Sequence, residues 1–83
     1  MAYRSREEIF ASILRTAGSG EGITRSKIMF GAYLTYSQVV DYTKMLIQRG
    51  LIEHDSINKT FKTTPRGFTF IQLHNELNQM IKI

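Results

Sequence analysis

The sequence has no cysteine, no tryptophan, one proline and two histidines. The absence of cysteine excludes disulfides, thiol catalysis and cysteine-based zinc sites, and it suits a reducing cytoplasm. No stretch approaches the roughly 20 consecutive apolar residues that a membrane-spanning helix needs. The N-terminus also lacks the apolar run of a signal peptide. We therefore expect a cytoplasmic location.

Catalytic and metal-binding constellations are also scarce. The two histidines, His54 and His74, have no cysteine and no carboxylate pair at ligand spacing beside them. Both are more typical of surface or interface residues than of catalytic bases. The sequence therefore predicts no enzyme activity, no metal and no cofactor.

Length and charge set the next limits. The 83 residues, 42% of them hydrophobic and 22% charged, correspond to one folded domain. A chain this short buries only roughly 60–65% of its unfolded surface, so pairing with a second copy is a natural source of further buried area. The net charge of +4 and the pI near 9.7 point modestly towards a polyanion such as nucleic acid.

The most informative stretch runs from Thr35 to Gly50. It opens with a capping box between Thr35 and Gln38, and it closes with Arg49 and Gly50, which suit a helix end. Inward positions recur at helical spacing, at Val39, Val40, Thr43, Leu46 and Ile47. The opposite face carries Ser37, Gln38, Asp41, Lys44 and Gln48, with Tyr42 near its edge. Two interpretations stay open: the second helix of a helix-turn-helix that faces a nucleic acid, or an ordinary amphipathic helix with a solvated face.

The segments before this stretch predict two more helices. Ser5 and Glu8 form a second capping box, and an apolar stripe follows up to Ala17, so we expect a core helix over residues 6–17. The glycine-rich residues 18–22 predict a plain connector, because a phosphate-binding loop would follow a strand. A very short strand is expected at 22–24, and Thr24 suits the N-cap of a short helix over 25–31.

Two cations, Arg25 and Lys27, fall in the first turn of that short helix. Cations there oppose the helix dipole at a cost of a few tenths of a kcal/mol, which a bound phosphate would remove. Chance placement of two surface cations is the alternative. Residues 31–34 then form the turn into the Thr35–Gly50 stretch, which completes a helix-turn-helix pattern.

After Gly50 the hydrophobic period changes. Residues 51–54 and 60–63 predict two strands, and the turn-forming residues 55–58 join them into a hairpin. A hairpin directly after a helix-turn-helix is a wing. Lys59 and Lys62 would add positive charge to the wing, although lysines that protect a solvated sheet edge are the alternative interpretation.

Thr64 and Pro65 suit the start of a final helix. Its apolar residues Phe70, Leu73, Leu77 and Met80 follow the spacing of a coiled-coil seam, while Phe68, Ile71 and Ile81 lie off it. We therefore expect one apolar face on the domain and a second face on another copy of the chain. A single wide core-facing stripe is the alternative. The expected organisation is a winged helix-turn-helix over residues 1–66 and a dimerisation helix over 67–83, an α+β fold that is mainly helical. The expected interface residues are Phe70, Leu73, Leu77, Met80 and Ile81.

Several segments carry a family resemblance. They are residues 5–9 with Ile13 and Leu14, residues 24–32, 34–36 and 42–46, then 50–52, and finally Phe61 with 64–67. Together they resemble the small basic winged-helix DNA-binding proteins of archaea, the 10-kDa dimeric chromatin type and related predicted transcriptional regulators. The resemblance implies duplex DNA as ligand and an antiparallel coiled-coil dimer. The chain departs from the family in its shorter last helix. It also has Thr63 where the family tends to have an apolar residue, which suggests looser packing of the strand that enters that helix.

The functional expectation follows from these patterns. The sequence predicts a homodimeric duplex-DNA-binding protein, a transcriptional regulator or a nucleoid-associated chromatin protein, with a protein-interaction module as the alternative. The residues expected to contact DNA are Arg25, Lys27, Tyr36, Ser37, Gln38, Lys44, Lys59 and Lys62. Gln38 would read an adenine edge, and Tyr36 and Ser37 would hold phosphates. Asp41 would accept from a cytosine amino group or form an ion pair with a nearby cation such as Lys44.

Overall fold

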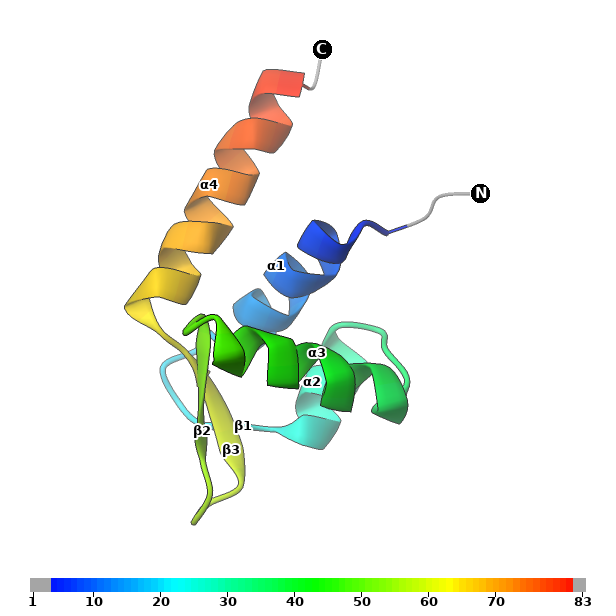
Figure 1. The fold of residues 1–83 in the computed structure, drawn as a ribbon, viewed down its shortest axis with the longest axis vertical. Coiled ribbons are helices and arrows are strands. Elements are labelled where there is room, and N and C mark those ends of the chain that lie inside the picture. Colours follow the sequence, from blue (N-terminus) through cyan, green and yellow to red (C-terminus); the bar gives the residue numbers. More distant parts are fainter. Residues whose placement is uncertain (1–3, 82–83) are drawn as a thin grey trace.

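The computed structural model describes residues 4–81 and contains four helices and a small three-stranded sheet (Figure 1). The elements are α1 (Arg6–Thr16), β1 (Ile23–Thr24), α2 (Arg25–Gly31), α3 (Tyr36–Gln48), β2 (Ile52–Asp55), β3 (Thr60–Thr63) and α4 (Pro65–Ile81). This order confirms the winged helix-turn-helix expected from the sequence. The expected N-terminal arm at residues 1–3 and the last two residues of the expected C-terminal helix, 82 and 83, lie outside the described residues.

Side-chain caps explain where the helices begin. At α1, the Ser5 hydroxyl accepts from the Glu8 amide at 3.1 Å, and the Glu8 carboxylate accepts from the Ser5 amide at 3.3 Å. At α4, the Thr64 hydroxyl accepts from the Gly67 amide at 3.0 Å. These bonds satisfy amides that have no partner inside the helix. The predicted starts of both helices are therefore confirmed.

The sheet is antiparallel, with strand order β1-β3-β2. On β3, Phe61 lies opposite Ile23 of β1 on one side and opposite His54 of β2 on the other. The short β1 thus ties the start of α2 to the hairpin. Figure 1 shows the hairpin extending away from the helices, as a wing does, while α4 leaves the domain in the other direction.

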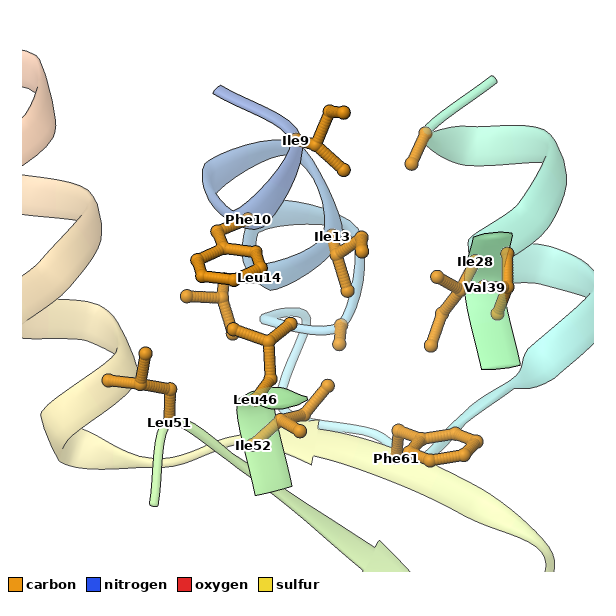
Figure 2. Packing of buried hydrophobic residues seen from close by; sticks show 12 residues of the cluster. Ile9, Phe10, Ile13, Leu14, Ile28, Val39, Leu46, Leu51, Ile52 and Phe61 are labelled. Atoms are coloured by element: carbon orange, nitrogen blue, oxygen red, sulfur yellow. The ribbon is translucent and has the colours of Figure 1, made fainter. Parts of the chain in front are cut away.

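The core lies between α1, α2, α3 and the base of the sheet (Figure 2). Helix α1 supplies the largest share, because it buries side chains towards each of these elements. The labelled core residues are Ile9, Phe10, Ile13, Leu14, Ile28, Val39, Leu46, Leu51, Ile52 and Phe61. Within residues 4–81, no helix is both long enough and apolar enough to cross a membrane.

Thr63 is packed differently from the sequence-based expectation. Its side chain is only 8% exposed, and its hydroxyl donates to the carbonyl oxygen of Leu14 at 2.6 Å. Its amide donates to the carbonyl oxygen of Ala17 at 3.2 Å. The threonine thus ties β3 to the end of α1, and its buried polar atom is satisfied. The expectation of looser packing at this position was wrong.

Candidate nucleic-acid interface

The short helix α2 and the longer α3 form the helix-turn-helix. The Thr35 hydroxyl accepts from the Gln38 amide at 3.2 Å, and the Gln38 side-chain oxygen accepts from the Thr35 amide at 2.9 Å. This capping box fixes the first turn of α3. The inner face of α3 buries Val39, Thr43 and Leu46 against the core.

The outer face of α3 is polar and exposed. Its polar residues are all exposed: Tyr36, Ser37, Gln38, Asp41, Lys44 and Gln48. Such a face has the size and chemistry to enter the major groove of duplex DNA, which admits one α-helix. The predicted inward face is confirmed at Val39, Thr43 and Leu46. Of the other two expected inward positions, Val40 is half-buried and Ile47 is exposed, because both lie one position round the helix from that stripe.

Gln38 also caps the start of α3, and this limits its use as a base-reading residue. The contact expected with adenine uses the amide oxygen as acceptor and the amide nitrogen as donor. In the structure, the oxygen already accepts from the Thr35 amide. A two-pronged contact would therefore require Gln38 to share or release its cap, whereas the amide nitrogen can donate without that cost.

A groove connects α2, the start of α3 and the wing. It has a volume of about 490 Å³, and its lining comes from all three elements: Arg25, Ser26, Tyr36, His54, Ser56, Lys59 and Phe61. Three of the predicted DNA contacts, Arg25, Tyr36 and Lys59, are thus brought together although they are far apart in the sequence. Cations and hydroxyls that converge on one groove are the groups that bind phosphate oxygens.

Arg25 is held in this groove by an aromatic ring. Its guanidinium carbon lies 5.4 Å from the centroid of Phe61, and His54 stacks on the same ring at 4.5 Å. Such a contact between a guanidinium and a ring face is favourable. Among the described residues, the buried Nε of Arg25 has no hydrogen-bond partner. The side chain is therefore positioned, but part of its donor capacity is unused.

The other predicted cations do not line this groove. Lys27 on α2 and Lys44 on α3 are exposed. Lys62 lines a separate hollow on the hairpin with Glu53, His54, Asp55 and Thr60. Two carboxylates in that hollow offset its charge, so Lys62 is the predicted contact with the least favourable surroundings.

Several arginines have roles within the fold. Arg4 donates to the carbonyl oxygen of Ala32 at 2.7 Å, and Arg66 donates to that of Arg49 at 3.0 Å. Arg15 donates to the Asn75 side chain at 2.7 Å. By contrast, the lysines within residues 4–81 all lie exposed on α2, α3 or the hairpin. The lysine charges of the described residues therefore lie on the elements that carry the candidate interface.

The two histidines each lie against an aromatic ring. His54 stacks on Phe61, and His74 stacks on Phe70 with a centroid separation of 6.2 Å. Within residues 4–81, no group of three histidine, cysteine or acidic side chains is placed to hold a metal ion.

The turn of the wing is organised by Asp55. One carboxylate oxygen accepts from the amides of Ile57 at 2.9 Å and Asn58 at 3.2 Å, and the other accepts from the Asn58 side chain at 2.8 Å. These bonds, above all the one from the Asn58 amide, lower the pKa of Asp55. Hydrogen bonds to the ionised form favour that form.

Acid is therefore expected to loosen the wing turn. Because the folded pKa of Asp55 lies below its unfolded value, the stabilisation is complete at neutral pH and is lost as the pH falls through the folded pKa. An NMR titration should show the Ile57 and Asn58 amide signals moving together below the ordinary pKa of 3.8. In Asp55→Asn that common step should disappear. A step at or above the ordinary pKa would contradict this account of the turn.

Helix α4 carries the predicted dimer residues in two environments. Phe70 is half-buried and lies 6.2 Å from the ring of Phe10 in its own domain. Leu73, Leu77, Met80 and Ile81 are 60%, 56%, 82% and 66% exposed. Phe70 thus belongs partly to the core, while the other four form an exposed apolar strip, here called the α4 strip.

The sequence missed some residues of the groove. Four residues that line it, Ser26, His54, Ser56 and Phe61, carry no sequence signal of a DNA contact. Strand pairing offers one signal, because a hairpin that turns at residues 56–59 places His54 opposite Phe61. The approach of Arg25 to Phe61 depends on the long-range pairing of β1 with β3, which no local pattern encodes.

Known proteins share this architecture. Residues 3–82 match a family model described as winged helix-turn-helix. Among solved structures, Sso10a-2, a DNA-binding protein from Sulfolobus solfataricus, aligns with a TM-score of 0.83 at 20% identity, over 95% of this chain and 83% of the other. This agrees with the resemblance to archaeal winged-helix proteins, and at this identity it shows the fold alone. No curated protein matches the chain. Because the family model spans nearly the whole sequence, the chain belongs to the winged helix-turn-helix family.

Proposed function

We propose that this protein binds duplex DNA through one surface, made of α2, the outer face of α3 and the β2–β3 wing. The observation that carries this proposal is the groove in which Arg25, Tyr36 and Lys59 converge from three elements. The DNA-binding activity named for Sso10a-2, which shares the fold, supports the same function. This role requires no catalytic residue and no cofactor.

In the proposed complex α3 enters the major groove. Ser37, Gln38 and Lys44 on its exposed face reach base edges or phosphates. Arg25 and Lys59 hold the DNA backbone on one side of the helix, and Lys27 adds a further phosphate contact. Asp41 is unfavourable near phosphate, so in the proposed complex it accepts from a cytosine amino group or offsets the charge of Lys44.

We further propose that the protein acts as a homodimer paired through the α4 strip. The supporting observation is the exposure of Leu73, Leu77, Met80 and Ile81 on one helix. An apolar strip of this kind is stabilised by burial against a second copy, and a two-fold pair presents two α3 helices to the DNA. The DNA would then carry two half-sites.

Chemical-shift mapping tests the proposed surface. On addition of a short duplex, the amide signals of α2, the first half of α3 and residues 55–60 are expected to shift, while those of α1 are expected to stay. Ser37→Ala and Ser12→Ala form a matched pair, because Ser12 lies on α1 away from this surface; only the first should change the map. Shifts confined to α4 would contradict the proposed surface.

Two cellular roles follow from DNA binding, control of specific genes or general association with chromosomal DNA in the nucleoid. They differ in the ratio of specific to non-specific affinity, which is typically 10³–10⁷ for a specific regulator. Selection of preferred duplexes from a random pool separates them. A recovered palindrome indicates a regulator, and an unenriched pool indicates general coating.

A further inference from the structure

The tip of the wing presents an apolar side chain to solvent. The register pairs Asp55 with Thr60, so the turn consists of residues 56–59, and Ile57 within it is 89% exposed. Figure 1 shows this tip at the end of the hairpin, away from the helices. A single exposed isoleucine is common on protein surfaces. Its position and neighbours must therefore carry any functional argument.

Neither packing nor turn chemistry accounts for isoleucine at this point. The turn is held by the hydrogen bonds from Ile57 and Asn58 to Asp55. It closes at Lys59, which adopts a left-handed backbone conformation with a φ of 56°. Turns of this kind favour glycine, asparagine, aspartate and serine, while β-branched residues favour strands. The structure thus holds an apolar side chain outward on a well-anchored turn that gains nothing from it.

The tip adjoins the groove of the proposed DNA surface. Ser56 and Lys59, on either side of Ile57 in the turn, line that groove together with Arg25 and Tyr36. From His54 in the groove to Ile57 is three residues, or at most about 10 Å of extended chain. The minor groove of B-DNA is roughly 7.5 Å deep. This upper limit exceeds the depth of the groove, so the chain length permits Ile57 to approach the floor while the cations stay at the backbone.

We propose that Ile57 is a wedge that enters the minor groove beside the α3 site and partly unstacks one base step. This inference rests on the proposed function. Apolar wedges of this type kink DNA by roughly 20–90° towards the major groove. Pyrimidine–purine steps unstack most easily, so the wedge adds a preference for such a step at a position that α3 does not contact. Lys59 holds the phosphate next to the kink.

Two optical readouts test the wedge on the intact protein. A duplex with 2-aminopurine at a central TA step reports unstacking by a rise in fluorescence, and end-labelled duplexes report bending by energy transfer. With the natural protein we expect both signals, with a bend of at least about 20°. Ile57→Leu should keep them, and Ile57→Ser should lose most of both. Since Ile57 is 89% exposed, neither variant should change the melting temperature.

The salt dependence of binding separates this proposal from the proposed function. Ile57→Ser removes no charge, so its slope of log affinity against log salt should equal that of the natural protein. If the natural protein binds DNA with a steep salt slope but without unstacking or bending, the wedge is wrong and the DNA surface stands. An Ile57→Ser protein that still bends the duplex fully overturns the wedge as well. If no duplex is bound at all, both proposals fail.

Discussion

Alanine in place of Arg25, Lys27 and Lys44 is expected to lower the affinity for duplex DNA by about 1,000-fold per bound protomer at 50 mM salt. Each lost phosphate contact removes the release of about 0.9 counterion, which is worth roughly tenfold at this salt concentration. If each protomer neutralises about four phosphates, the slope of log affinity against log salt should change from about −3.6 to about −0.9 per protomer. Fluorescence anisotropy with a labelled duplex measures both quantities.

A matched control and a stability measurement separate the loss of DNA contacts from general effects of charge and unfolding. Arg6 is an exposed cation on α1, away from the proposed surface, so Arg6→Ala should leave the slope within about 0.3 of that of the natural protein. Arg25 also contacts the Phe61 ring, and the triple variant must therefore be checked by thermal unfolding. A folded triple variant with an unchanged slope would show that these cations do not contact DNA.

Glutamate in place of both Leu77 and Met80 is expected to turn the dimer into a monomer. Burial of a leucine or methionine side chain is worth about 1.5–3 kcal/mol. Because both protomers of a two-fold dimer carry each substitution, its cost to dimerisation is doubled. The dimer dissociation constant should therefore rise at least about 1,000-fold. Sedimentation equilibrium should show the mass falling from twice the chain mass to 9.6 kDa.

Gln79→Glu is the matched control for this second prediction. It adds charge to the same exposed helix but lies outside the α4 strip, so the dimer should persist. A natural protein that is monomeric at high micromolar concentration would contradict pairing through the α4 strip. It would leave the DNA surface intact, because that surface lies on other elements.

The sequence was sufficient to predict the elements and their order. The capping boxes at Ser5 and Thr35 and the threonine before Pro65 fixed three helix starts within one residue, because such caps act locally. The change from helical to alternating period after Gly50 located the wing. Each of these signals depends on residues close together in the chain.

The details of the site depended on tertiary contacts. The groove exists because β1 pairs with β3 and leads directly into α2, which brings Arg25 over Phe61. The contact of Phe70 with Phe10 depends on how α4 lies on α1, which the spacing of the expected seam does not show. The hydroxyl of Thr63 reaches Leu14, 49 residues away. Spacing along the chain reports a face of an element but not what covers that face.

A titration of the natural protein into a random duplex of about 30 base pairs, at several salt concentrations, tests the central claim most directly. The account predicts micromolar or tighter binding at low salt, with log affinity falling against log salt at a slope of about −3 to −4 per protomer. The absence of binding at low salt, or binding that does not change with salt, would contradict a DNA-contacting surface built from the cations of α2, α3 and the wing.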